Sequence, residues 1–426
     1  MIILHVVGVP GLKKSLILLL LILAVTSLSL SCGSSNSGTG TVSGLKFRAF
    51  ISQDILTAGA GVQIIDAQND KRAVVPAISA GNSPGQMVVT PNRVQTLVFS
   101  PSDRQLTFIS NGGEKASGSV TLPGSTESFV VSSDSQTVYV AVPTATVFGQ
   151  SPGAVEILNL NNGGSKGELD IPAVRYLVLG HSGNRLLAFS DNSDSVNVIT
   201  FGTGNPTITP VPGFDRPVTA FFSGDDNTAF VVNCGLECGG AQASVQTLDL
   251  SQDPPVAGAQ FAVPAATSAV LDGTTLYLAG TPVPASPCTG QTTASTSCGL
   301  LTVFDLSSMS PVNTSLLPIT DGYHNRMALG ADGQLFIGSH TCTEIIAVNT
   351  GDEVRGCLSI YNTQTGAVVI PPDNGNVTGI EPIPTRHIVY LAQGGELQIY
   401  DTTTDKLQAT QIDISGEVID VKTVDF

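Results

Sequence analysis

Residues 173–213 read AVRYLVLGHSGNRLLAFSDNSDSVNVITFGTGNPTITPVPG and hold four short apolar runs separated by turn clusters. Each run has the length and β-branched content of a strand; the runs are Tyr176–Leu179, Leu186–Phe189, Val196–Ile199 and Thr207–Val211. The gaps are too short for a crossover helix, so neighbouring runs must pair antiparallel through hairpins. A four-stranded sheet of about forty residues is the repeat unit of a β-propeller.

The rest of the chain divides into units of the same kind. Three strand-like runs follow residue 45, and further units span 83–124, 125–172, 173–213, 214–264, 265–320, 321–374 and 375–415. The lone run Glu417–Phe426 would complete the three-stranded first unit, closing the ring and covering two exposed sheet edges. We therefore expect an all-β fold: a single β-propeller of four-stranded blades. We expect eight blades, and seven if one irregular repeat is divided differently.

The third strand of most units carries a repeated pattern that ends in Asp or Asn. Examples are Val62–Asp66 (VQIID), Val155–Asn159 (VEILN) and Leu397–Asp401 (LQIYD). The terminal Asp or Asn can close the following turn through its own backbone. Together with second-strand runs such as Thr137–Ala141 (TVYVA), these repeats resemble the YVTN-type repeat of bacterial surface-layer and lactonase-like propellers. The resemblance extends from about residue 45 to the end and implies a fold more than a function, because propellers host many unrelated sites.

The amino terminus has the pattern of a secretion signal. Lys13 and Lys14 precede the apolar run Ser15–Leu30, which ends in small residues before Cys32. This segment resembles a bacterial lipoprotein signal, which implies that Cys32 becomes the lipidated first residue of the mature chain. An uncleaved membrane anchor is the alternative. We expect a signal peptide over 1–31, the lipidated Cys and a flexible tether rich in Gly and Ser over 32–44, and the propeller over 45–426.

Charge and localisation narrow the range of partners. The formal net charge is −16, and such a surface repels nucleic acid, so no nucleic-acid partner is expected. The lipoprotein resemblance implies a lipid-anchored protein of the bacterial cell envelope. Gly33 after Cys32, rather than Asp, favours the outer membrane or its periplasmic face under the sorting rule of some bacteria.

Six cysteines follow Cys32, and they fall into sequential pairs within single units. The pairs are Cys234 with Cys238, Cys288 with Cys298, and Cys342 with Cys357. Each pair lies between the second and third strands of its own unit, so we expect three local disulfides. A zinc site at Cys234 and Cys238 is the alternative, but no second pair or paired His lies beside them, and no metal is expected. In propellers these connections share a face with the links between blades, around the mouth of the central channel.

A polar ring is expected at this mouth. Aligning the units on their second strands places one polar residue from each of several units at the start of the innermost strand: Gln86, Glu127, Arg175, His324 and Thr378. Arg216, Arg326 and His340 lie close to these positions in the sequence. Arg175, His324 and Arg326 could hold a carboxylate or phosphate by charge-assisted hydrogen bonds, with Glu127 available as a base.

The sequence favours binding over catalysis. We expect a non-catalytic, lipid-anchored propeller that binds an envelope protein or glycan through its loop-rich, disulfide-closed face. The alternative is a lactonase-like hydrolase, because members of that family use His, Arg and Glu near the channel mouth, as His324, Arg326 and Glu127 would. Quinone-dependent dehydrogenase propellers rely on tryptophan, and this chain has none, so no cofactor is expected.

Overall fold

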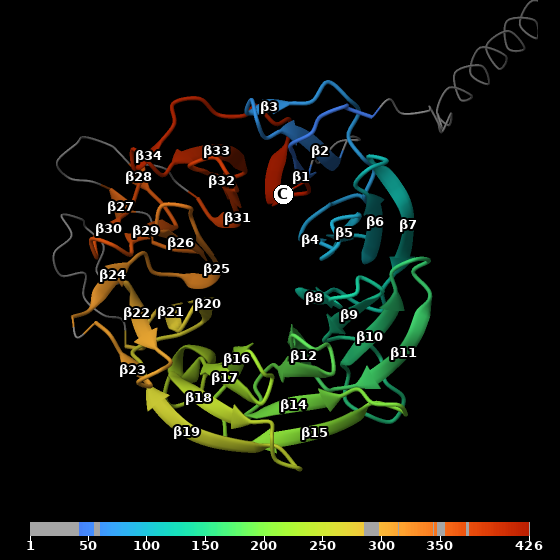
Figure 1. Cartoon of the computed structure of the whole chain (residues 1–426), viewed down its shortest axis with the longest axis vertical. Helices are drawn as coiled ribbons and strands as arrows, with labels where there is room; N and C mark the ends of the chain where they lie inside the picture. Colours follow the sequence, from blue (N-terminus) through green and yellow to red (C-terminus); the bar gives the residue numbers. More distant parts are fainter. Residues whose placement is uncertain are drawn as a thin grey trace, which may run out of the picture. The chain divides into compact units, whose positions relative to one another are not determined.

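Eight antiparallel β-sheets stand around a central channel as the blades of a propeller (Figure 1). The computed structural model describes residues 42–54, 60–284, 298–313, 315–343, 345–346, 354–371 and 375–425. Within them every blade is built on four strands, counted here from first to fourth outward from the channel. This confirms the all-β propeller expected from the sequence, with eight blades and not seven.

Blades 1 to 4 combine the amino-terminal half of the domain with the last strand of the chain. Blade 1 contains β35 (Glu417–Thr423), β1 (Arg48–Asp54), β2 (Gly61–Asp66) and β3 (Lys71–Arg72). Blade 2 contains β4 (Met87–Val89), β5 (Gln95–Ser100), β6 (Gln105–Ser110) and β7 (Lys115–Thr121). Blade 3 contains β8 (Ser128–Val131), β9 (Thr137–Val142), β10 (Ala154–Asn159) and β11 (Ser165–Asp170). Blade 4, the stretch quoted first, contains β12 (Val174–Leu179), β13 (Arg185–Ser190), β14 (Ser195–Thr200) and β15 (Thr207–Pro212).

Blades 5 to 8 follow the same order, with additions in two of them. Blade 5 contains β16 (Pro217–Phe222), β17 (Thr228–Asn233), β18 (Ser244–Asp249) and β19 (Val256–Ala262). Blade 6 contains β20 (Ser268–Asp272), β21 (Thr275–Gly280), β22 (Gly299–Asp305) and β23 (Ser310–Pro311), and β24 (Leu317–Ile319) also pairs with β22. Blade 7 contains β25 (Tyr323–Leu329), β26 (Gln334–His340), β29 (Leu358–Asn362) and β30 (Val368–Val369), with a separate hairpin of β27 (Ile345–Ile346) and β28 (Val354–Arg355). Blade 8 contains β31 (Val377–Ile383), β32 (Ile388–Gln393), β33 (Glu396–Asp401) and β34 (Lys406–Leu407).

The carboxyl-terminal strand closes the ring, as the sequence predicts. β35 pairs antiparallel with β1, placing Val421 opposite Ile51 and Thr423 opposite Ala49. The first and last strands of the domain therefore share one sheet. This pairing covers backbone groups that would otherwise remain exposed at two sheet edges.

The hydrophobic core lies between the blades, because each blade packs both of its faces against neighbours. In β13, Leu186 and Ala188 pack with blade 3, whereas Leu187 and Phe189 pack with blade 5. Successive residues of a strand point to opposite faces, so a strand buried on both faces needs an unbroken apolar run. Full burial of each Leu or Phe contributes roughly 1.5–3 kcal/mol, which explains why the second strands show the strongest apolar signal.

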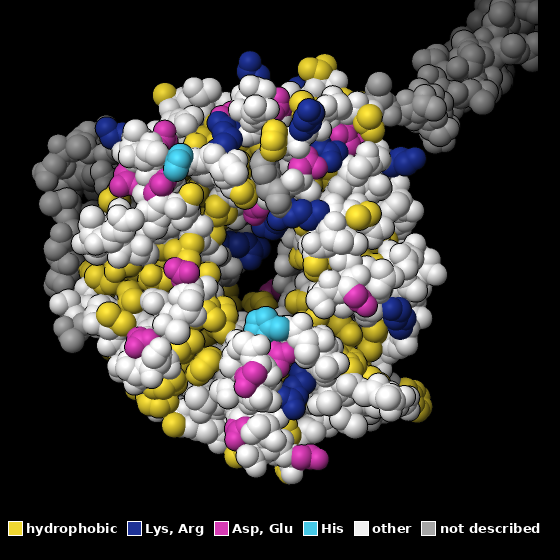
Figure 2. Space-filling model, in the orientation of Figure 1, with side chains coloured by type: hydrophobic (Ala, Val, Ile, Leu, Met, Phe, Trp, Pro, Cys, Tyr) yellow, Lys and Arg dark blue, Asp and Glu magenta, His cyan; other side chains and the backbone are white. Residues whose placement is uncertain are grey.

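Strand direction gives the propeller two distinct faces. First and third strands run in one direction, and second and fourth strands run in the other. The links between blades and the second-to-third connections therefore lie on one face, here called the mouth face. The first-to-second and third-to-fourth hairpins lie on the opposite face, here called the far face. Figure 2 shows Lys and Arg side chains beside the central opening.

Two of the three expected disulfides lie within the described residues. Cys234 and Cys238 are joined at an S–S distance of 1.99 Å, and Cys342 and Cys357 at 2.06 Å. Because the sulfurs of Cys234 and Cys238 are bonded to each other, they do not form the zinc site that was the alternative. Cys288 lies outside the described residues, so its pairing with Cys298 stays a prediction.

The expected signal peptide and Cys32 also lie outside the described residues, which begin at Val42. In the part of the chain that the structure describes, no helix is both long and apolar enough to cross a membrane.

Candidate functional site

Five innermost strands contain a β-bulge near the mouth face. The pairing with the second strand skips one residue in each, namely Arg175, Val218, Asn325, Thr378 and Ile419. A bulge leaves the extra residue unpaired and redirects its side chain. Four of these residues line a cavity of about 510 Å³ in the channel, and Arg175 lines an adjoining cavity of about 340 Å³. The bulges allow strands that are packed on both faces to present side chains to the channel mouth.

Most of the predicted ring residues meet at these two cavities. Gln86 and Glu127 directly precede the first strands of blades 2 and 3 and line the channel cavity. Thr378, Arg326 and His340 line the same cavity from blades 8 and 7. The adjoining cavity lies beside blades 4 and 5, and its lining includes Arg175 and Arg216 together with Glu127.

His324 does not belong to the ring, which corrects the sequence alignment. Its side chain is 0% exposed, and Nε2 lies 2.9 Å from the carbonyl oxygen of Thr320. The ring occupies space left by Gly299, where a Cβ atom would come within 2.7 Å of it. Burial lowers the pKa of His324 to about 4, so the imidazole is neutral near pH 7. The bulged residue of blade 7 is Asn325, one position later, so His324 is not available to hold an anion.

Arg175 is fully engaged by neighbouring carboxylates. Its Nε and Nη2 donate to the two carboxylate oxygens of Asp191 at 2.6 Å each, and Nη1 donates to Glu127 Oε1 at 2.6 Å. These bonds, that to Asp191 first, raise the pKa of Arg175. The Tyr176 hydroxyl lies 3.3 Å from both Glu127 Oε2 and the Tyr323 hydroxyl, so the cluster connects blades 3, 4 and 7. Arg175 therefore holds the mouth together rather than offering a free guanidinium.

Arg326 differs from the other basic groups at the channel. Its Nε donates to the Thr378 carbonyl oxygen at 2.8 Å and its Nη1 to the Asn325 carbonyl oxygen at 3.1 Å. No carboxylate within the described residues forms an ion pair with it. The other cations have such partners: Arg175 as above, Arg216 with Asp194 at 3.5 Å, and Lys422 with Glu381 and Asp420 at 3.4 Å each.

Two neighbours of Arg326 add hydrogen-bonding capacity to the cavity. His340 lines the cavity, and burial together with the charge of Arg326 lowers its pKa, so its ring is neutral near pH 7. Asn325 Oδ1 is buried and has no hydrogen-bond partner among the described residues. The cavity lining therefore combines one guanidinium, one neutral imidazole and one amide acceptor with the carboxylates of Glu127 and Asp420, which already accept hydrogen bonds from Arg175 and from the Met87 amide.

The loop closed by Cys234 and Cys238 covers the edge of the adjoining cavity. Cys238 is among the lining residues, and a short 3₁₀ turn spans Gly235–Cys238. Within this turn Glu237 Oε2 accepts a hydrogen bond of 2.8 Å from the Thr281 amide of blade 6. Burial raises the pKa of Glu237 to about 7. The loop thus ties blade 5 to blade 6 at the mouth face.

The sequence indicated the segment 321–326 as a candidate site but did not single out Tyr323 or Asn325 within it, and it did not indicate Tyr176 or Asp191 as site residues. Asp191 could have been found, because it directly follows the second strand of blade 4 and second strands end at the mouth face. The two tyrosines adjoin predicted ring positions in the sequence, and both line the two cavities. In the portion of the chain described by the structure, no group of three or more His, Cys, Asp or Glu side chains could hold a metal ion.

The fold of this chain is similar to solved structures, although its sequence matches no known family or curated protein. Dihydro-heme d1 dehydrogenase NirN in complex with DHE is similar with a TM-score of 0.62 and 14% identity, over 89% of this chain and 75% of that one. A eukaryotic initiation factor has a TM-score of 0.52 and 12% identity, over 89% of this chain and 98% of that one. Identities this low show the propeller fold alone.

A third solved structure is a protein provisionally assigned as a 6-phosphogluconolactonase from Bacteroides uniformis. Its TM-score is 0.47 at 12% identity, over 88% of this chain and 99% of that one. A similarity at this TM-score is too loose to support any statement about activity.

Proposed function

We propose that this protein is a non-catalytic binding module of the bacterial cell envelope, anchored through a lipidated Cys32. It takes an anionic group of a protein or glycan partner into the channel mouth. Arg326 is the observation that supports an anionic ligand. Its guanidinium lies in the 510 Å³ channel cavity and has no carboxylate partner among the described residues. A guanidinium binds carboxylate and phosphate groups through directed, charge-assisted hydrogen bonds.

The chemistry around Arg326 supports this ligand class. An anion bound there would be held in a cavity with a reduced dielectric, where its attraction to the guanidinium is stronger than in water. The buried acceptor Asn325 Oδ1 favours a ligand that also carries a hydroxyl or amide donor. Because Arg175 is already neutralised by Asp191 and Glu127, it would orient the Tyr176 and Tyr323 hydroxyls instead of binding the anion.

The proposed envelope location rests on two observations. Disulfides persist in oxidising compartments such as the bacterial periplasm, and two of them close loops of this domain. The apolar run before Cys32 has the pattern of a lipoprotein signal. Both observations agree with export, and the second also agrees with anchoring at a membrane surface.

One observation keeps a lactonase-like hydrolase as a second candidate function. His340, which is neutral near pH 7, lines the same cavity as Arg326 and Glu127. It would replace His324 as the histidine of a hydrolytic site. In that case His340 would act as general base and Arg326 would stabilise the developing oxyanion.

Titration calorimetry on the purified full chain tests the proposal. The probes are a glucuronate oligosaccharide, a neutral glucose oligosaccharide of equal length, and a short peptide with a free or an amidated carboxyl terminus. We expect an anionic probe to bind and its neutral counterpart not to bind. Loss of a hydrogen-bonded charge costs about 1.5–3 kcal/mol, so Arg326→Met should weaken binding roughly ten- to hundredfold.

The matched control is Arg104→Met, which removes an exposed charge between β5 and β6 on the same face. Equal affinity for the anionic and neutral probes would contradict the proposal. Unchanged affinity of Arg326→Met for the anionic probe would contradict it as well. Turnover of a lactone probe by the wild type that is lost in His340→Asn would favour the hydrolase.

A further inference from the structure

The chain enters the propeller on the far face. β1 is the second strand of blade 1, and second strands run from the far face to the mouth face. Its first residue, Arg48, therefore lies on the far face, where its carbonyl oxygen accepts a hydrogen bond of 3.0 Å from the Val424 amide. All described residues that precede β1 join the domain at this end.

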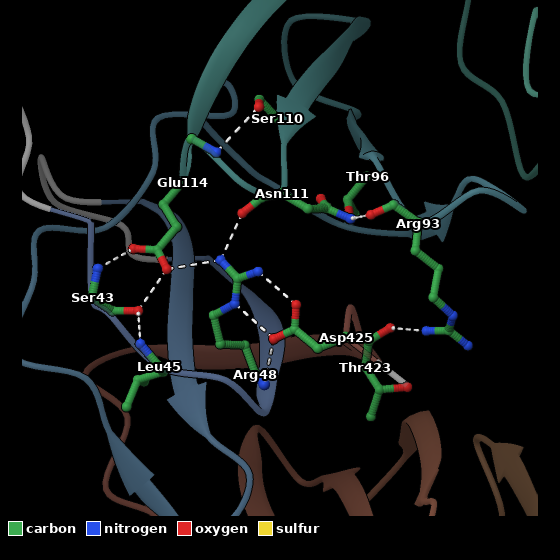
Figure 3. A network of polar contacts seen from close by, with 11 residues as sticks. Ser43, Leu45, Arg48, Arg93, Thr96, Ser110, Asn111, Glu114, Thr423 and Asp425 are labelled. Carbon is green, nitrogen blue, oxygen red and sulfur yellow. Dashed lines mark hydrogen bonds and ion pairs between the residues drawn. The ribbon is translucent and has the colours of Figure 1, made fainter.

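A buried polar network fixes the point where the tether leaves (Figure 3). The Ser43 amide and hydroxyl both donate to the carboxylate of Glu114, which lies in the hairpin between β6 and β7 on the far face. Arg48 Nη1 donates to Glu114 Oε1 at 2.8 Å, and Arg48 Nη2 donates to Asp425 Oδ1 at 2.6 Å. Arg48 and Glu114 are 10% and 5% exposed at their side chains. This network binds the start of the domain to blade 2 and to the carboxyl-terminal segment.

We infer that the anchored molecule turns its far face toward the bilayer and presents the mouth face to a partner outside the membrane. The inference rests on the proposed anchoring through Cys32. About ten residues separate Cys32 from Val42, and a fully extended chain of that length spans at most about 35 Å. Blade strands of six or seven residues span about 20 Å, so the mouth loops lie about that much farther from the bilayer. In this orientation the mouth face, which carries Arg326, points away from the lipid headgroups of the anchoring leaflet.

The absence of tryptophan from the chain makes this orientation measurable. Val94→Trp places one indole on the far face, between β4 and β5, where Val94 is 57% exposed. Phe148→Trp places one on the mouth face, between β9 and β10, where Phe148 is 101% exposed. Each lipidated full-length variant is reconstituted on vesicles of phosphatidylethanolamine and phosphatidylglycerol that carry dansyl-phosphatidylethanolamine. Energy transfer from the indole to dansyl reports the distance of that face from the lipid.

We expect stronger transfer from position 94 than from position 148. Equal transfer, or stronger transfer from position 148 in vesicle-bound protein, would overturn the orientation and leave the anchoring intact. Flotation tests the anchoring separately, with Cys32→Ser as the control. Wild type that does not float with the vesicles, or Cys32→Ser that floats equally well, would overturn the anchoring and the orientation with it.

Discussion

Glu237 is a carboxyl group of the mouth face that lies in the disulfide loop of blade 5. Its Oε2 accepts the Thr281 amide, and the Thr281 hydroxyl donates to the Gly322 carbonyl oxygen at 2.8 Å. This chain of contacts crosses from the disulfide loop of blade 5 through blade 6 to the link that precedes blade 7. Because burial raises the pKa of Glu237 to about 7, the side chain changes charge within the physiological range.

Glu237→Gln should change stability in a pH-dependent manner. The pKa of Glu237 in the folded protein lies above its ordinary value of 4.5. Its contribution to stability is therefore fully present below about pH 4.5 and is lost as the pH rises through 7. Relative to the wild type, Glu237→Gln should gain roughly 2 kcal/mol in unfolding free energy between pH 5 and pH 8, because Gln stays neutral and can still accept the Thr281 amide.

Urea unfolding at the two pH values measures this gain. Glu396→Gln, at an exposed position of β33, is the matched control and should show little change with pH. A difference between Glu237→Gln and the wild type that is the same at both pH values would contradict the assignment.

At the scale of single residues, the sequence predicts which side chains lie at the mouth better than it predicts which of them are free to bind a ligand. Glu127 and Arg175 lie at the mouth as expected, but their ion pairs remove them as free ligand groups. Asp191, the partner of Arg175, lies 16 positions away across a hairpin, and only its place directly after a second strand marks it in the sequence. Arg326 becomes the principal candidate only when these pairs are known.

Among the structural elements, the β-bulges explain the error at His324. β25 reads YHNRMAL and has three successive polar residues at 324–326, so the sequence does not show which of them is the extra residue. The extra residue nevertheless shifts which side chain reaches the channel, from His324 to Asn325. The strands themselves and the placement of the two described disulfide loops follow from turn clusters and apolar runs, and these were predicted correctly.

The two described disulfides should differ in their contribution to stability. Cys342 and Cys357 are 15 positions apart, whereas Cys234 and Cys238 are 4 apart. Loop-closure entropy predicts a loss of about 3 kcal/mol for the double serine variant of the longer loop and about 2 kcal/mol for that of the shorter loop. Thermal unfolding of the two double variants should therefore give the larger decrease in Tm for Cys342→Ser with Cys357→Ser. The reverse order would contradict the entropic account.

For the whole molecule, closure of the ring depends on the joint between the two ends of the domain. Arg48 donates through Nε and Nη2 to Asp425 and through Nη1 to Glu114 (Figure 3). Arg48→Met would leave two largely buried carboxylates without their cation, and breaking such a pair costs about 3–5 kcal/mol. We expect a large decrease in the free energy of unfolding, measured by urea denaturation. Arg72→Met, at an exposed position of β3 in the same blade, is the control, and equal unfolding of the two variants would contradict a closing role for this network.

The repeat pattern of the sequence predicts the ring because each blade must bury both faces against neighbours. Function does not follow from the repeats, since all blades share them. It depends on differences between blades, such as Arg326 in blade 7 or the disulfide loop of blade 5. These residues can form a site only because the ring brings blades 3, 4, 5 and 7 together at one opening.

Photo-cross-linking in intact cells tests most directly whether the mouth binds a partner through Arg326. The photoreactive residue p-benzoylphenylalanine replaces Tyr323 at the mouth, and a control carries it at Val256 on the outer strand β19, where the side chain is 50% exposed. We expect a defined adduct from position 323 that is absent from position 256 and that disappears when Arg326→Met is added. An adduct that persists with Arg326→Met, or that forms equally from position 256, would contradict this expectation.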